Sequence, residues 1–226
     1  MVQAKGDDRG RVQTSETFLL GAFLSFSGGL QDAYTYFLRD NVFANAQTGN
    51  IILMSSSLMK GDVPSGVKYL FPVVSFILGI LVAEQIGARY KSSGKLHWRQ
   101  IILLLEILIL GIVGFVPCEY NMLANVLVSF ACSMQVQAFR TMHGYGYATT
   151  MCIGNLRSGT ESLSVFLRRK EKKYLNKAVQ YYGIIAVFAL GAGIGSILSE
   201  MLGFSTIWIC CALLAAACLM MRKKYR

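Results

Sequence analysis

Apolar runs of about 20 residues recur along this chain from Thr17 onward, and each is long enough to cross the hydrocarbon core of a bilayer as a helix. The chain is 54% hydrophobic and only 15% charged, with a mean hydropathy of +0.48. Such a composition is rare in a soluble domain of 226 residues. The pattern therefore predicts an all-α integral membrane protein. Its six longest apolar segments are 17–38, 68–88, 100–117, 121–141, 178–200 and 205–221.

Positive charge gathers in short segments between the apolar runs. The formal net charge is +10, which in a soluble protein would indicate a nucleic-acid partner. Here the basic residues form three clusters, within 89–99, 168–177 and 222–226. This distribution is typical of cytoplasmic loops, so we expect the lipid bilayer as the partner and no nucleic acid. The first run follows a charged tail, residues 1–16, and is typical of a retained signal-anchor helix.

Two further segments, 42–60 and 147–167, carry several polar side chains, so the number of spans is six or eight. If both segments crossed, three spans would separate the first two basic clusters and place them on opposite sides. With six spans, all three clusters and both termini are cytoplasmic. We therefore expect six transmembrane helices plus two re-entrant or broken-helix segments sheltered by the bundle. Gly49 and Gly154 suit the breaks, because glycine accepts unusual backbone angles; short full spans are the alternative.

The chain also repeats a pattern at a spacing of 105 residues. This shift aligns Asp32 with Gln137, and Gly49-Asn50 with Gly154-Asn155. Each half holds three full spans, so the halves must be inverted relative to each other, an arrangement common in transporters. A stripe of small residues that suits close helix packing recurs in both halves. Its members are Gly79, Ala83 and Gly87 in the first half, and Gly191, Gly195 and Ser199 in the second.

These observations predict one membrane domain, residues 1–226, built from two inverted repeats. The first repeat covers 17–117 and the second 121–221, between cytoplasmic tails at 1–16 and 222–226. A bundle of this size is thin, which allows a homodimer.

Polar side chains inside the apolar segments are the candidate site residues. Asp32 is costly in hydrocarbon and should face the bundle interior, either as a proton- or cation-linked site or in an ion pair with Arg140 or Arg157. The neutral candidates either line a solute or ion pathway or satisfy backbone groups freed by the helix breaks. Arg157 either pairs with Glu161 or attracts an anion. The neutral candidates are Asn45, Gln47, Thr48, Asn50, Gln137, Thr149, Thr150 and Asn155.

Signatures of catalysis are missing from the sequence. It has no glycine-rich phosphate loop, no nucleophile elbow and no HExxH motif. The six cysteines lie in or beside apolar segments and none has CxxC spacing, which argues against a disulfide framework or a zinc site. We therefore expect neither an enzyme nor a cofactor or metal.

Four blocks of sequence resemble the YoaK family of bacterial integral membrane proteins. They are GLQDAYTY (29–36), VFANAQTGN (42–50), SMQVQAFR (133–140) and YATTMCIGNLRS (147–158), and the resemblance extends from about Phe18 to Met220. It implies six spans in a bacterial cell membrane, but no settled function. In the last block the family commonly has Thr-Gly-Asn or Thr-Gly-Thr, whereas this chain has Ile153 in place of the first threonine. One candidate hydroxyl group is therefore missing.

Two functions of different kinds fit these observations. The first is a small inner-membrane transporter or channel-like permease, in which two Gly-Asn segments form a polar site near the midplane around Asp32. The second is a membrane scaffold or sensor that transports nothing, in which the same polar residues hold the bundle together.

Overall fold

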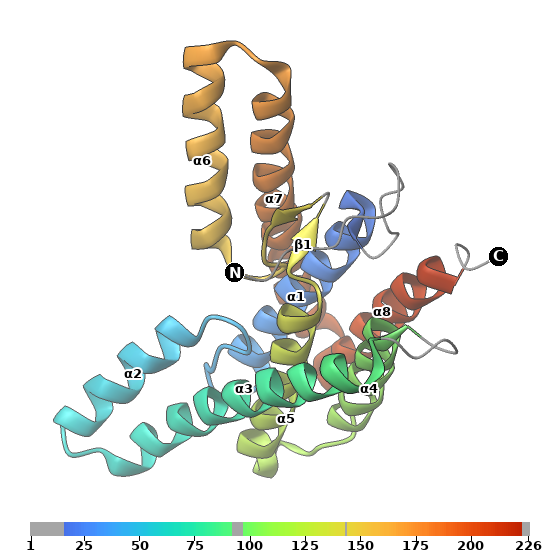
Figure 1. Ribbon diagram of the computed structural model, residues 1–226. Coiled ribbons are helices and arrows are strands. Elements are labelled where there is room, and N and C mark those ends of the chain that lie inside the picture. The colour runs from blue at the N-terminus through green and yellow to red at the C-terminus, as the bar shows by residue number, and fades with distance from the viewer. Residues whose placement is uncertain (1–15, 92–96, 143, 223–226) are drawn as a thin grey trace.

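The computed structural model describes residues 16–91, 97–142 and 144–222, which are almost entirely helical (Figure 1). The expected cytoplasmic tails lie almost wholly outside these residues. The α-helices are α1 (Phe18–Leu38), α2 (Gln47–Met59), α3 (Val63–Tyr90), α4 (Trp98–Val113), α5 (Asn121–Ala138), α6 (Cys152–Arg169), α7 (Lys172–Leu202) and α8 (Ile207–Arg222). Two 3₁₀ turns, η2 (Cys118–Tyr120) and η3 (Gly203–Thr206), and a two-residue antiparallel ladder of β1 (Thr141–Met142) with β2 (Tyr145–Gly146) complete the fold.

Small residues bring the long helices into close contact. Helix α1 packs along α7, and α3 packs along α5. A Cβ atom added at Gly29 or Gly191 would collide with a backbone carbonyl of the facing helix, and one added at Gly79 would collide with Ser133 of α5. Gly79 and Gly191, one member of each predicted small-residue stripe, therefore lie at helix crossings, where backbones can approach only without side chains.

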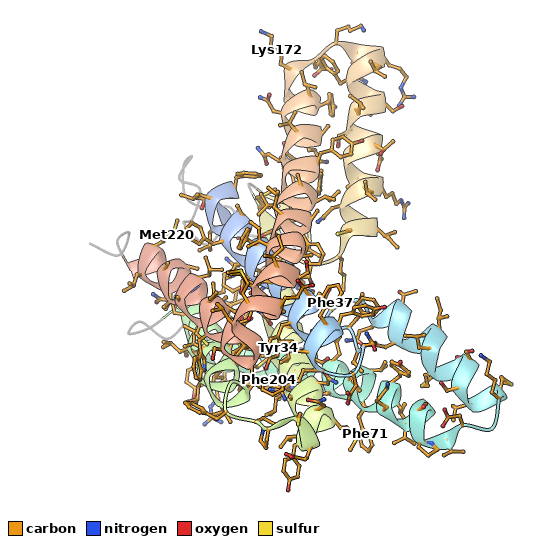
Figure 2. The ribbon with its side chains drawn as sticks, turned by 180° about the vertical axis from the view of Figure 1, so that it is seen from behind. Tyr34, Phe37, Phe71, Lys172, Phe204 and Met220 are labelled. Atoms are coloured by element: carbon orange, nitrogen blue, oxygen red, sulfur yellow. The ribbon has the colours of Figure 1, made fainter. Side chains whose placement is uncertain are left out.

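Two helical hairpins leave the bundle in different directions (Figures 1 and 2). Helix α2 packs against α3, and α6 packs against α7. The first hairpin turns at Gly61 and the second at Lys170, both in left-handed backbone (φ 77° and 56°). The expectation of helix breaks at Gly49 and Gly154 is wrong, because each is the third residue of its helix. The interruptions instead lie just before these helices.

The core is formed by α1, α4, α5 and α8, whose apolar residues pack together. Arg39, fully buried, fastens the end of α1 to the connection between α4 and α5. Its guanidinium donates to the carbonyl oxygens of Val113 (3.2 Å) and Val116 (2.8 Å) and to the Tyr34 hydroxyl (2.7 Å). It also lies 3.8 Å from the centre of the Phe204 ring, and Figure 2 shows Tyr34 and Phe204 near each other. These contacts compensate the burial of a charge that has left water.

Two helical stretches of the described chain are long and apolar enough to cross a membrane, judged by length and composition. They are Val63–Tyr90, which is α3, and Lys172–Met221, which contains α7, η3 and most of α8. Helices α4 and α8 have only 16 residues each. The all-helical architecture agrees with the expected fold class, while the six-span count and the inverted repeat stay predictions.

Candidate functional site

The connection between α1 and α2 folds back along the end of α1. It can do so because Asp40 and Asn41 both adopt left-handed backbone (φ 63° and 57°), which short polar side chains tolerate. On the return, the Phe43 ring stacks on Tyr36 with ring centroids 4.7 Å apart. The backbone of residues 43–46 is thereby brought beside the carboxyl-terminal half of α1.

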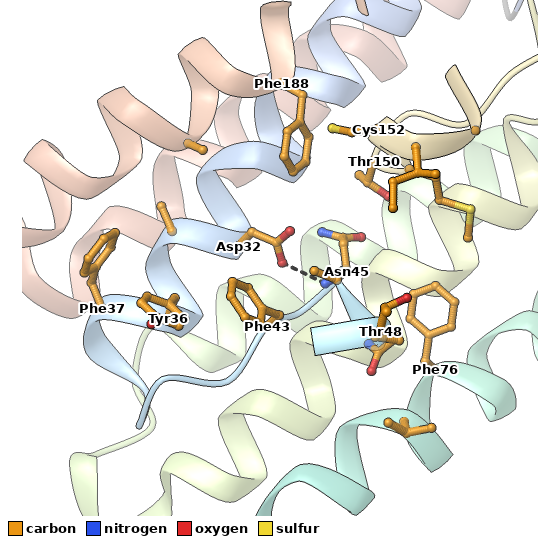
Figure 3. Close-up of a pocket in the computed structure, with 18 of the residues that line it drawn as sticks. Asp32, Tyr36, Phe37, Phe43, Asn45, Thr48, Phe76, Thr150, Cys152 and Phe188 are labelled. Carbon is orange, nitrogen blue, oxygen red and sulfur yellow. Dashed lines mark hydrogen bonds between the residues drawn. The ribbon is translucent and has the colours of Figure 1, made fainter. Parts of the chain in front are cut away.

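Asp32 receives this returning loop. Its Oδ1 accepts a hydrogen bond from the Asn45 N–H at 2.7 Å (Figure 3), and the Asn45 side-chain amide donates to the Gly28 carbonyl at 3.3 Å. The Asp32 residue is only 8% exposed. The carboxyl group therefore fixes the loop and also borders the cavity that the loop helps to form.

Asn50 and Asn155 hold their chains in the same way. Asn50 accepts from the Phe43 N–H at 3.1 Å and donates to the Phe43 carbonyl at 2.7 Å. Asn155 accepts from the Ala148 N–H at 3.2 Å and donates to the Ala148 carbonyl at 2.6 Å. In each case the asparagine lies seven residues after the backbone that it binds. Both amides therefore position the irregular segment before a helix, and neither lines the cavity.

A cavity of about 790 Å³ lies where the two irregular segments meet (Figure 3). This volume suits a small organic ligand. Its polar lining is sparse, and the rest of its wall is apolar or aromatic. Asp32, Asn45, Gln47, Thr48 and Thr150 contribute the main polar side chains, while Tyr36, Phe37, Phe43, Phe76, Met151, Cys152, Ile153 and Phe188 contribute much of the remainder.

Five of the ten predicted site residues thus come together at this cavity: Asp32, Asn45, Gln47, Thr48 and Thr150. Three others serve other purposes in the described structure. Asn50 and Asn155 bind backbone, and Thr149 accepts a hydrogen bond from the Gln135 side chain at 3.1 Å.

Gln137, another of the candidate site residues, lies away from the cavity that Asp32 borders. It is hydrogen-bonded to Glu84 and lines a second cavity of about 690 Å³, with Arg99 and Arg140. Burial lowers the pKa of His97 in the same wall. The 105-residue shift aligns Gln137 with Asp32 in sequence. If the two halves are inverted, however, residues aligned in this way lie at opposite ends of the bundle. Along α3, residues 73–77 border the first cavity and residues 83–88 the second.

The ion pairs proposed for the charged candidates are also wrong. Within the described residues, neither Asp32 nor Arg157 forms an ion pair. Arg140 lies 4.0 Å from Glu84 instead. Arg157 is exposed on α6, away from the cavity lining, and does not reach Glu161. Asp32 is therefore a buried carboxyl group whose described partners are neutral.

The aromatic part of the cavity wall was missed in the sequence. Tyr36, Phe43, Phe76 and Phe188 come from three helices and a loop. In a membrane protein such residues are indistinguishable by sequence from lipid-facing or core residues. Only the spacing of Tyr36 four residues after Asp32, one helical turn, could have placed a ring beside the carboxylate.

A second buried polar cluster lies in the core. Glu106 of α4 is fully buried, and its Oε1 accepts from the Gln31 amide at 3.2 Å. Gln31 also accepts from the Cys132 thiol at 2.8 Å. The cluster links α1, α4 and α5, which fits interhelical hydrogen bonding. Among the described residues, no group of three or more His, Cys, Asp and Glu side chains could hold a metal ion.

Comparison with known proteins identified a family and one relative. The sequence model of a family described as "Protein of unknown function (DUF1275)" matches residues 20–220. The chain is 24% identical over 200 residues to UPF0700 transmembrane protein YoaK of Bacillus subtilis (strain 168), an alignment that covers 83% of this chain and 86% of that protein. No solved structure matches the chain.

Proposed function

The chain belongs to the DUF1275 family of proteins of unknown function, and we propose that it is a transporter or channel-like permease for a small solute or ion. It is a membrane protein, as its transmembrane relative indicates. The observation that carries the proposal is the cavity of about 790 Å³ bordered by the buried carboxyl group of Asp32. A buried ionisable group beside a ligand-sized cavity in a membrane protein is typical of a solute or ion pathway.

The pattern of helix contacts supports two inverted repeats as part of this proposal. In the first half α2 packs on α3, and in the second half α6 packs on α7. The cross-contacts correspond as well, since α1 packs on α7 as α5 packs on α3. Asn50 and Asn155 bind backbone in matching ways. Inverted repeats place a solute site where interrupted helices meet.

The two cavities suggest how access could alternate. They lie at different levels of α3, on either side of the close crossing of Gly79 with Ser133. A small rotation of α3 against α5 would open or close a passage there, as in transporters that rock one repeat against the other. We place the second cavity, with its charged side chains, toward the cytoplasm, because the basic segment at 89–99 favours that side.

Transport is tested by flux. Purified protein in proteoliposomes is assayed against a panel of solutes that includes organic cations, organic anions, neutral metabolites and inorganic ions, with empty liposomes as the background. We expect uptake of at least one class. If correctly folded wild-type protein moves no solute, the transport proposal fails.

A scaffold or sensor is the second candidate, and one observation favours it. Asp32, Asn50 and Asn155 all bind backbone groups of irregular segments, which is a structural task. In that case Asp32→Asn would lower stability in detergent without altering any flux. The transport proposal also includes six membrane spans, a location in a bacterial cell membrane, cytoplasmic termini and a homodimer.

A further inference from the structure

The wall of the cavity beside Asp32 carries charge of one sign. Among the described residues that line it, Asp32 is the only Asp, Glu, Lys, Arg or His. A carboxyl group in an apolar wall attracts a cation, and none of the described lining residues carries a positive charge to compensate an anion. A small metal ion is disfavoured too, because it needs several oxygen ligands to replace its water.

Aromatic rings lie around this carboxyl group. Tyr36 and Phe43 stack on each other on one side of Asp32, and Phe188 of α7 lies on another (Figure 3). Aromatic faces attract organic cations and also bury apolar groups. The wall therefore suits a ligand with a positive head and an apolar or aromatic body.

Two oxygen atoms of residues that line the cavity have no hydrogen-bond partner among the described residues. They are Oγ1 of Thr150 and Oδ1 of Asn45, both buried, in residues that are only 7% and 6% exposed. Both residues line the cavity. Buried polar atoms are normally hydrogen-bonded, so these two oxygens are candidate acceptors for a ligand that donates hydrogen bonds.

We propose that this cavity binds a protonated organic amine with an apolar or aromatic body. The ammonium group pairs with Asp32 and donates N–H bonds to Thr150 and Asn45, while the body lies against the rings. The inference rests on the proposed transport function for its biological meaning, but binding itself is independent of flux.

Binding is tested with radiolabelled 2-phenylethylamine and full-length protein in lipid nanodiscs, with empty nanodiscs as background. We expect saturable binding that 3-phenylpropionate, a carboxylate of similar shape, does not displace. Asp32→Asn should weaken binding about tenfold or more, since the bond to a charged group is lost. Asp62→Asn is the matched control, because Asp62 is an exposed cap of α3 outside the cavity, and it should bind as the wild type does.

Thr150→Val provides a second variant with nearly unchanged shape. It should weaken 2-phenylethylamine binding several-fold but leave phenethyltrimethylammonium unaffected, because that cation has no N–H to donate. Equal displacement by the carboxylate, an unchanged affinity in Asp32→Asn, or no amine binding by folded protein would overturn the inference. If another solute shows Asp32-dependent flux but no amine binds, the amine-binding inference is overturned while the transport proposal stands. Amine binding without any flux would support the amine-binding inference and count against the transport proposal.

Discussion

Asn50 and Asn155 each satisfy both polar groups of a residue seven positions earlier in the chain. Side-chain amides suit this task because one end accepts and the other donates. The irregular segments before α2 and α6 would otherwise leave backbone groups unpaired inside a membrane protein, where each costs several kcal/mol. At the residue scale, each asparagine of the repeated Gly-Asn pair therefore holds in place a segment that forms part of the cavity wall.

Asn50→Ala should destabilise the protein by about 2–4 kcal/mol, because it removes three hydrogen bonds and leaves the Phe43 N–H and carbonyl unpaired. The free energy of unfolding, measured by SDS titration in mixed micelles, checks this. Ser56→Ala is the control, since Ser56 is exposed on the same helix, and should change stability by less than about 0.5 kcal/mol. An equally small effect of both substitutions would show that Asn50 does not hold the loop.

Single residues were only partly predictable from sequence. Asp32, Asn45 and Thr150 could be chosen because polar groups are conspicuous in apolar segments. Gln137 could not be placed, because alignment by a fixed shift says nothing about which end of the bundle a residue occupies. Arg39 was not singled out, since an arginine after an apolar run resembles an interfacial residue, whereas here neutral carbonyl oxygens and rings surround it.

At the element scale, the apolar runs predicted helix positions well. The run at 17–38 corresponds to α1 (Phe18–Leu38), and the run at 121–141 corresponds to α5 (Asn121–Ala138). Hydropathy marks these ends because charged residues stay near water. It failed where a helix continues into charged sequence, as at the start of α7 (Lys172–Leu202), because a helix in water tolerates lysines. The hairpin partners α2 and α6 were recognised as segments, but not as regular helices.

The α1–α7 crossing depends on glycine at particular positions of α7. Gly191→Ala should destabilise by about 1–3 kcal/mol, because the new methyl group would collide with the Phe26 carbonyl of α1. Gly193→Ala is the matched control two residues away. Its Cβ would meet nothing within 4 Å, so this change should be neutral or stabilising by up to about 1 kcal/mol. The same SDS titration compares the two, and similar values would contradict a close crossing at Gly191.

At the scale of the whole molecule, the cavity depends on contacts between segments far apart in sequence. Residues 43–48 and 150–154 meet there, with α1, α3 and α7 around them. Neither hairpin encloses the cavity by itself, so the site requires both halves of the chain. The sequence predicted that two polar segments converge. It could not predict the mostly aromatic and apolar wall, because that wall is created by tertiary packing.

The proposed six-span topology makes a prediction about an existing thiol. Cys118, exposed in η2 between α4 and α5, should face the outside of the cell. A membrane-impermeant maleimide should label it on intact cells, and Cys118→Ser should abolish that labelling. In the Cys118→Ser background, Lys173→Cys should be labelled only after permeabilisation, because it lies in the basic segment expected in the cytoplasm. The reverse pattern would show that the topology is inverted, and labelling of both from outside would exclude six spans.

The central claim is that Asp32 is the solute-binding group of a transporter, and initial rates of uptake test it most directly. For a solute that the wild-type protein moves in proteoliposomes, rates are measured over a range of concentrations for wild type, Asp32→Asn and Asp62→Asn. Thermal unfolding is monitored on the same samples. We predict that kcat/KM falls about tenfold or more in Asp32→Asn, while Asp62→Asn transports as the wild type does and all three proteins stay folded. Unchanged kcat/KM in folded Asp32→Asn protein would contradict the claim.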